Sequence, residues 1–249
     1  MMGFSFTAHA AIVPVANPGF EDTTGQVVFN EFTFGTPTGW SLYDPNAIIP
    51  DPGVFTGTLF PNGVDFFDSP APEGSRVSIL FANNQLGAGE YGYTQNLAAV
   101  VQSNFRYDLS VEVGNIASGT AQSGEFFNLD EFPGYRVELL AGGQVIAQDN
   151  NSLAGSIPEG EFRSATVSVT IGASHPLLGQ ALGIRLVNLN EIPDGFDAGT
   201  SPDLEVDFDD VQLDAAIVPE TEMGMIILGM LGLGYVVCLR GQCFRRRGT

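Results

Sequence analysis

The feature that most constrains the fold of this chain is a period of two in its hydrophobic residues. In the clearest run, Phe105, Tyr107, Leu109, Val111 and Val113 alternate with polar side chains. Such alternation places one face of a strand in a core and the other in water, as in antiparallel sheets. Six further runs show the same period, at residues 77–81, 91–97, 135–139, 165–171, 182–186 and 204–208. We therefore predict an all-β, antiparallel two-sheet sandwich within a single domain spanning residues 11–217.

Turn chemistry supports this prediction. Gly142 and Gly143 lie between two apolar pairs, and both residues tolerate the positive φ angles of a tight hairpin turn. The stretch 44–73 is dense in Pro, Gly, Asn and Asp, so it is expected to form loops at one end of the sandwich.

Charge excludes one class of partner. The chain holds 29 acidic residues against 9 basic ones, for a net charge of −20, and all nine basic residues are arginines. A nucleic-acid-binding surface needs a basic patch, so a nucleic-acid partner is excluded. Hydrophobic residues make up 44 % of the chain, which is too many for a disordered acidic tail.

The C-terminus has a different character from the rest of the chain. Residues 223–239 contain no charged side chain, and this length is near the lower limit for a helix that crosses a bilayer. We predict a single C-terminal transmembrane helix here. The Arg-rich end, residues 240–249, would orient it with the arginines on the cytoplasmic side; these are Arg240, Arg245, Arg246 and Arg247.

Val218, Pro219, Glu220 and Thr221 immediately precede this segment. The order of parts in residues 218–249 resembles the PEP-CTERM sorting tail of bacterial surface proteins, although Thr221 stands where that family has a second proline. The resemblance implies an exosortase-type processing enzyme as partner. It also implies a protein held in the membrane by its C-terminal helix before processing, and found at the cell surface or outside the cell afterwards.

The N-terminus fits export. Ala8 and Ala10 match the small-x-small pattern that signal peptidase cleaves, which predicts a mature start near Ala11. Residues 1–10 are interpreted as the remnant of a signal peptide whose start codon is assigned too late.

Both ends of the predicted domain carry a second resemblance. The sequence Asn17-Pro18-Gly19-Phe20-Glu21, the pair Gly39-Trp40 and the closing run Phe208-Asp209-Asp210-Val211-Gln212-Leu213 are similar to those of jelly-roll carbohydrate-binding modules. The similarity covers residues 15–214 and implies a jelly-roll sandwich with Trp40 in its core.

A metal site follows from the same comparison. The first and last strands of such a sandwich lie close together, which would bring Glu21 near Asp209. Carboxylates and backbone carbonyls, that of Asn17 among them, are ligands that calcium prefers, and the resembled modules hold a structural calcium at this junction. We expect Ca²⁺ bound by Asn17, Glu21 and Asp209, with Asp210 a less favoured substitute. The alternative is that these acids only solvate strand ends.

Several other side chains have a structural and a functional interpretation. Asp203, Glu205, Asp207 and Asp209 are expected to form the wetted face of the last strand; a divalent-ion site in the loop 194–203 is the less favoured alternative. Exposed aromatic rings could stack on sugar rings, but core packing is favoured for each candidate. The candidates are Trp40, Tyr43, Tyr91 and Tyr93, together with Phe66 and Phe67 in the loop region.

Catalytic signatures are missing from the sequence of the predicted domain. It contains no cysteine, a single histidine (His175), and no nucleophile elbow, zinc-binding or phosphate-binding motif. We therefore predict a protein that is not an enzyme but a non-catalytic component of the surface or extracellular matrix. Two alternatives are a carbohydrate-binding module for an extracellular polysaccharide and a structural spacer bridged by calcium.

Overall fold

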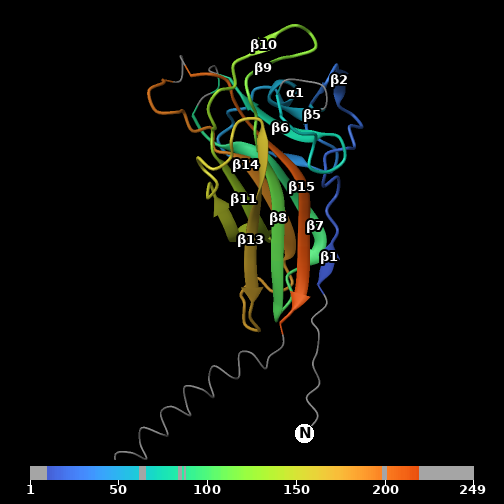
Figure 1. Ribbon diagram of the computed structural model, residues 1–249. Coiled ribbons are helices and arrows are strands. Elements are labelled where there is room, and N and C mark those ends of the chain that lie inside the picture. The colour runs from blue at the N-terminus through green and yellow to red at the C-terminus, as the bar shows by residue number, and fades with distance from the viewer. Residues whose placement is uncertain (1–9, 62–65, 84–85, 87, 198–200, 219–249) are drawn as a thin grey trace, which may run out of the picture.

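The computed structural model describes residues 10–61, 66–83, 86, 88–197 and 201–218, which form two antiparallel β-sheets packed face to face (Figure 1). The larger sheet has the order β13 (Glu161–Ile171), β8 (Phe105–Asn115), β15 (Leu204–Ile217), β6 (Val77–Ala82), β5 (Thr56–Leu59), β3 (Phe32–Phe34) and β2 (Val27–Phe29). Strand β1 (Ala11–Val13) also pairs with the last part of β15.

The smaller sheet has the order β12 (Gln144–Asn150), β11 (Tyr135–Ala141), β14 (Ala181–Asn188), β7 (Tyr91–Val100) and β4 (Ser41–Tyr43). A separate hairpin pairs β9 (Gly119–Thr120) with β10 (Phe126–Phe127), and a short helix, α1, spans Pro52–Phe55. The predicted all-β, antiparallel architecture is confirmed, and the two facing sheets are consistent with the predicted sandwich.

None of the helices in the described part of the chain is long and apolar enough to cross a membrane. The predicted transmembrane segment, residues 223–239, lies outside the described residues.

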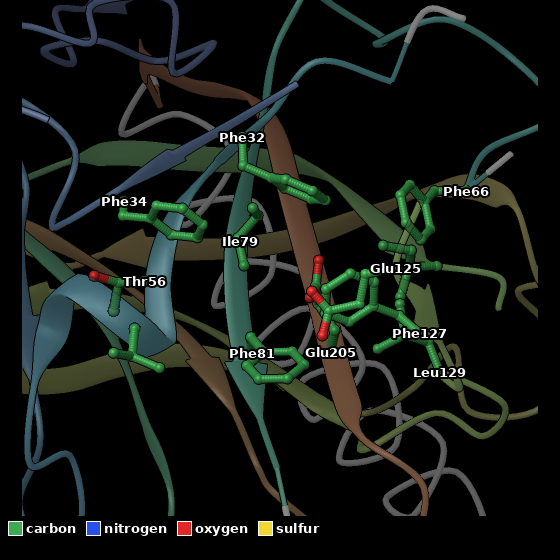
Figure 2. A pocket seen from close by; sticks show the side chains of 12 residues that line it. Phe32, Phe34, Thr56, Phe66, Ile79, Phe81, Glu125, Phe127, Leu129 and Glu205 are labelled. Carbon is green, nitrogen blue, oxygen red and sulfur yellow. The ribbon is translucent and has the colours of Figure 1, made fainter. Parts of the chain in front are cut away.

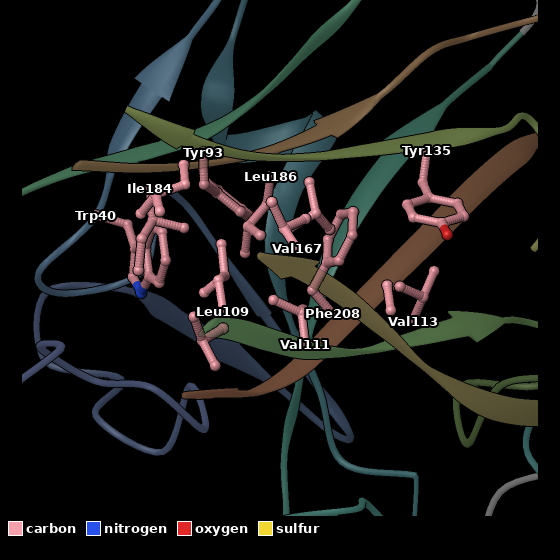
Figure 3. Packing of buried hydrophobic residues seen from close by; sticks show 14 of the residues in the cluster. Trp40, Tyr93, Leu109, Val111, Val113, Tyr135, Val167, Ile184, Leu186 and Phe208 are labelled. Atoms are coloured by element: carbon pink, nitrogen blue, oxygen red, sulfur yellow. The ribbon is translucent and has the colours of Figure 1, made fainter. Parts of the chain in front are cut away.

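The main core lies between the two sheets and follows the period of two. Leu109, Val111 and Val113 of β8 point into it together with Phe208 of β15 (Figure 3). Val206 of β15 belongs to the same cluster. Each of the seven predicted runs lies within a strand. The Gly142-Gly143 turn between β11 and β12 is also confirmed, with φ angles of 55° and 80°.

The stretch 44–73 is not made of loops alone, because it contains α1 and β5. Every residue of β5 is buried, so its sequence Thr-Gly-Thr-Leu shows no alternation that could reveal a strand. Strands β2 and β3 have only three residues each, too few to establish a period.

A buried hydroxyl joins the two sheets. Tyr93 lies on β7 of the smaller sheet and is fully buried, with its ring against Trp40. Its hydroxyl donates a hydrogen bond to the Ile79 carbonyl (2.6 Å) and accepts one from the Gly57 backbone amide (3.1 Å), on β6 and β5 of the larger sheet. The hydroxyl therefore fixes the spacing of the sheets at the end where β5 and β6 pair.

Replacing Tyr93 tests this constraint. We expect Tyr93→Phe to lower the free energy of unfolding by about 1–3 kcal/mol, because it leaves two buried backbone groups without their partner. Urea unfolding followed by circular dichroism measures the loss. Tyr91→Phe is the matched control, since the Tyr91 hydroxyl on the same strand has one long contact of 3.5 Å with Asn188. Equal losses in the two variants would contradict the role assigned to Tyr93.

Candidate functional site

The larger sheet is covered on both faces at the end where β5 and β6 lie. Leu80 of β6 faces the sandwich core, whereas Val77 and Ile79 face the opposite side. There they join a second hydrophobic cluster with side chains from the segments around Phe66 and around Leu129. These segments form a layer on the outside of the sandwich.

A cavity of about 210 Å³ lies between this layer and the sheet. Its wall is apolar and aromatic, and two carboxyl side chains, those of Glu125 and Glu205, reach it. The lining residues are Phe32, Phe34, Val54, Thr56, Phe66, Ile79, Phe81, Ile116, Glu125, Phe127, Leu129 and Glu205. Figure 2 shows Glu205, from β15, among the aromatic rings that line the cavity, which we call the phenylalanine pocket.

The outer layer overturns the expectation of a wetted face on β15. Glu205 is 5 % exposed, and Asp207 and Asp209 are fully buried. The alternation does put these acids opposite the sandwich core, as predicted. The second layer then excludes water from that side, so the three carboxyl groups are desolvated.

Desolvation changes the protonation of two of these acids. Burial raises the pKa of Glu205 to about 8, although the adjacent Asp207 carboxyl lowers it somewhat. Burial, and then the charge of Glu205, raises the pKa of Asp207 well above its usual value. Apart from their contact with each other, Oε1 of Glu205 and both carboxyl oxygens of Asp207 have no hydrogen-bond partner among the described residues. Glu205 is therefore mainly protonated at neutral pH and presents a neutral acid to the pocket, and the upward shift in the pKa of Asp207 favours the protonated form of that group as well.

A buried glutamate contacts the β9–β10 hairpin beside the pocket. Glu31 lies in the turn between β2 and β3 and is 2 % exposed. Its Oε1 accepts a hydrogen bond of 2.7 Å from the backbone amide of Gln122, in the hairpin turn. The hairpin brings Glu125 and Phe127 to the pocket wall. Glu31 thus connects the pocket wall formed by β3 to the wall formed by the hairpin.

The structure brings the predicted calcium ligands into one region. Glu21 accepts hydrogen bonds from the backbone amides of Ser75 and Arg76, each at 2.7 Å. In the same loop, the Glu73 amide donates to Oδ2 of Asp209 at 2.8 Å. The first and last segments also meet directly, because the Val211 amide donates to the Pro18 carbonyl.

The predicted calcium ligands differ in whether their oxygen atoms already accept hydrogen bonds. Oδ1 of Asp209 is buried without a hydrogen-bond partner among the described residues, and burial raises the pKa of this carboxyl to about 8. Both oxygens of Glu21 accept hydrogen bonds, and the Asn17 carbonyl accepts one from Trp40. No group of three or more His, Cys, Asp or Glu side chains within the described ranges is placed to hold a metal ion.

The candidate sugar-stacking aromatics are engaged elsewhere. Trp40, Tyr91 and Tyr93 are buried, so the core position predicted for Trp40 is confirmed. Arg185 lies over the ring of Tyr43, 4.0 Å from its centroid. His175 is held in a local turn by the Leu177 amide and does not line the phenylalanine pocket.

Most residues of the predicted sorting and cleavage signals lie outside the described part of the chain. Of this set, Ala10 is exposed, and the Val218 amide donates to the Asn104 carbonyl at 2.7 Å. Those outside it are Ala8, Pro219, Glu220, Thr221, Arg240, Arg245, Arg246 and Arg247.

The phenylalanine pocket was not predicted from the sequence. Its acid was interpreted as part of a solvated face, since alternation alone does not show what covers the polar side of a strand. One signal was available. The segments 32–34, 66–67 and 126–127 each hold two phenylalanines, more aromatic residues than solvated loops usually carry.

Comparisons with known proteins point to one family. The profile of the HpiC1-like family, described as HpiC1 cyclase, matches residues 11–214. A crystal structure of a cyclase from Fischerella sp. TAU is 35 % identical over 85 % of this chain and 100 % of its own, with a TM-score of 0.69. No curated protein matches the chain.

Two further structures of cyclases from Fischerella sp. TAU contain ligands. One Stig cyclase is in complex with (3Z)-3-(1-methyl-2-pyrrolidinylidene)-3H-indole; it is 36 % identical over 85 % of this chain and 100 % of its own, with a TM-score of 0.69. The other is in complex with 4-(1H-indol-3-yl)butan-2-one; it is 36 % identical over 84 % of this chain and 99 % of its own, also with a TM-score of 0.69.

These matches correct the functional predictions made from the sequence. The expectation of a non-catalytic PEP-CTERM surface protein is wrong, because the family profile spans most of the chain and describes a cyclase. The predicted exosortase partner, membrane anchoring and surface location depended on that expectation, and they are withdrawn with it. The carbohydrate-binding and calcium-spacer alternatives are replaced for the same reason. The prediction that the chain is not an enzyme is also wrong, since the matched structures are cyclases.

The resemblance of residues 218–249 to a sorting tail thus pointed to the wrong family, and the domain that precedes this segment decides the assignment. With a matching family profile over residues 11–214 and cyclase structures that share more than a third of their residues with it, the chain belongs to the HpiC1-like cyclase family.

Proposed function

We propose that this protein closes a ring in an apolar, indole-type substrate bound in the phenylalanine pocket, with Glu205 as the acid. The observation that carries the proposal is a buried carboxyl group, protonated at neutral pH, that lines an otherwise aromatic and aliphatic cavity. The ligands of the two Fischerella cyclase structures support the substrate class, because both are indoles.

The chemistry is an isomerisation in which no atom is gained or lost. The Glu205 carboxyl transfers its proton to one carbon of a substrate alkene, so a C–H bond forms as the O–H bond breaks. The electron pair of a second π bond in the substrate then attacks the resulting carbocation and forms the new ring bond. Loss of a proton from the cyclised cation returns it to the Glu205 carboxylate.

The surrounding residues make this step feasible. The five phenylalanines exclude water, which would otherwise capture the cation, and their ring faces stabilise positive charge. Asp207 does not line the pocket; it acts as a positioning residue, because its protonated carboxyl contacts Glu205 from within the strand layer.

The acid role predicts a variant phenotype. We expect Glu205→Gln to lower turnover of a 3-alkenylindole by a factor of about 10²–10⁴, because the amide keeps the shape of the side chain but cannot donate an acidic proton. Liquid chromatography with mass spectrometry detects the cyclised isomer, whose mass equals that of the substrate. In D₂O the product should carry one added deuterium.

Two measurements separate catalysis from folding. Glu205→Gln should still bind 4-(1H-indol-3-yl)butan-2-one, as measured by calorimetry. In the wild type, turnover should fall as the pH rises through about 8, the pKa of Glu205, because the acid is then ionised. Undiminished turnover in Glu205→Gln, or a rate that rises through pH 8, would refute the assignment.

The hairpin connection gives a second test. Glu31→Ala should speed hydrogen exchange at the Gln122 amide and weaken binding of the same indole ketone by several-fold, since the hairpin wall of the pocket loses its buried acceptor. Glu31→Gln is the matched control, because its amide oxygen can still accept the Gln122 bond. Unchanged exchange in Glu31→Ala would show that the hairpin is held by other contacts.

We also propose a structural calcium at the junction of the first and last strands, which a jelly roll would place side by side. Support comes from Asp209, whose buried Oδ1 lacks a partner among the described residues and whose high pKa is what an uncompensated carboxylate would show. Glu21 and the Asn17 carbonyl remain the other proposed ligands. The ion would supply the positive charge that Asp209 lacks and would hold the loop 73–76 to β15.

Calcium binding predicts a change in stability. The pKa of Asp209 in the folded protein, about 8, lies above the ordinary aspartate value of 3.8. The native state therefore holds an extra proton between these values, and without metal, stability falls as the pH rises from about 4 to 8. We expect CaCl₂ at pH 8 to raise Tm by several degrees in the wild type but not in Asp209→Asn.

Asp210→Asn serves as the neighbouring control and should keep most of this increase. A Tm that neither CaCl₂ nor EDTA changes would exclude the site.

A further inference from the structure

The phenylalanine pocket has an unbalanced charge. Glu125 and Glu205 are the ionisable residues among the described side chains that line it. Asp203 lies close by: burial raises its pKa, and the charge of Glu125 raises it further. This side of the pocket is therefore built from carboxyl groups without an adjacent basic residue in its lining.

The arginines of the described part of the chain contact residues that do not line the pocket. Four of them, Arg106, Arg136, Arg163 and Arg185, form salt bridges with acids that do not line the pocket. Arg76 donates to the hydroxyl of Thr58. Because the chain also has no lysine, the lining carboxyl groups have no basic partner within the part of the chain that the structure describes.

The two lining acids differ in position and in exposure to solvent. Glu205 is 5 % exposed and protonated at neutral pH, so it lies at the inner, dry part of the pocket. Glu125 is exposed and follows the turn of the β9–β10 hairpin, so it lies where the pocket opens to solvent. A ligand in the pocket would thus meet aromatic walls and a neutral acid inside, and a carboxylate at the opening.

We infer that the pocket selects an indole-type ligand that carries a protonated amine, with the aromatic body inside and the ammonium group beside Glu125. This inference rests on the proposed function and specifies its substrate class. A cation at the opening pairs with the Glu125 carboxylate, which the protein leaves without a partner in the lining, and it also lies near ring faces that attract positive charge. A neutral or anionic ligand of the same shape gains neither interaction.

Three probes of one shape measure this selection. They are tryptamine, which is cationic at neutral pH, its neutral analogue 3-propylindole, and anionic 3-(indol-3-yl)propionate. Isothermal titration calorimetry at pH 7 and low salt gives the three dissociation constants. We expect tryptamine to bind about tenfold more tightly than 3-propylindole, and the anion to bind most weakly; salt should reduce the difference.

The variant Glu125→Gln identifies the group responsible. It should weaken tryptamine binding until the dissociation constant lies within about threefold of that of 3-propylindole. The affinity for 3-propylindole itself should stay unchanged. Asp214→Asn is the control, because it removes one negative charge from the far part of β15, where β1 pairs with it. That variant should keep the full preference for tryptamine.

The outcomes separate the inference from the function on which it rests. Equal affinity for tryptamine and 3-propylindole, or an equal loss of both in Glu125→Gln, overturns the charge selection but leaves an indole-binding pocket. If none of the three probes binds, while circular dichroism shows a folded protein, the indole-type substrate itself is refuted.

Discussion

The first part of strand β15, residues 204–209, is buried on both of its faces, and the chemistry proposed for this protein depends on that burial. One face supplies Leu204, Val206 and Phe208 to the sandwich core. The other lies beneath a second layer and carries Glu205 and Asp207. A carboxyl group loses hydration when it is covered and keeps its proton unless a cation or donors replace the water. The same strand that closes the sandwich thus gives the pocket its acid.

The carboxyl groups along this strand meet three different environments within five residues. Glu205 lines the phenylalanine pocket and Asp207 is fully buried. Asp209 accepts a hydrogen bond from the backbone amide of Glu73. A strand presents alternate residues to one face at spacings of about 6.6 Å. Three alternate residues of one strand can therefore act as the proposed acid, its positioning neighbour and a proposed metal ligand.

The parts of the fold that could be predicted are those that local geometry decides. The alternation of Leu109, Val111 and Val113 revealed β8 because a strand turns successive side chains to opposite faces. Gly142 and Gly143 revealed a turn because positive φ angles favour glycine. Both signals lie within a few residues of each other, so tertiary contacts did not alter them.

The candidate site could not be predicted because distant segments build it. Glu31 and Gln122, which hold two of its walls together, are 91 residues apart. The alternation indicates that Glu205 and Asp207 face away from the core between the two sheets. It does not indicate whether a second layer covers them. The signals quoted for Ala8 and Ala10 and for the C-terminal tail concern the ends of the chain, whereas the family assignment depends on residues 11–214.

Strand β15 also separates the pocket from both ends of the described chain. Glu205 lies near its start, while β1 pairs with its last residues and Val218 follows it directly (Figure 1). An extended strand rises about 3.3 Å per residue, which puts roughly 40 Å between the pocket acid and Val218. A bead, a fluorophore or a fused protein attached at either end would stand clear of the pocket opening. Immobilised protein should therefore exchange ligand as freely as protein in solution.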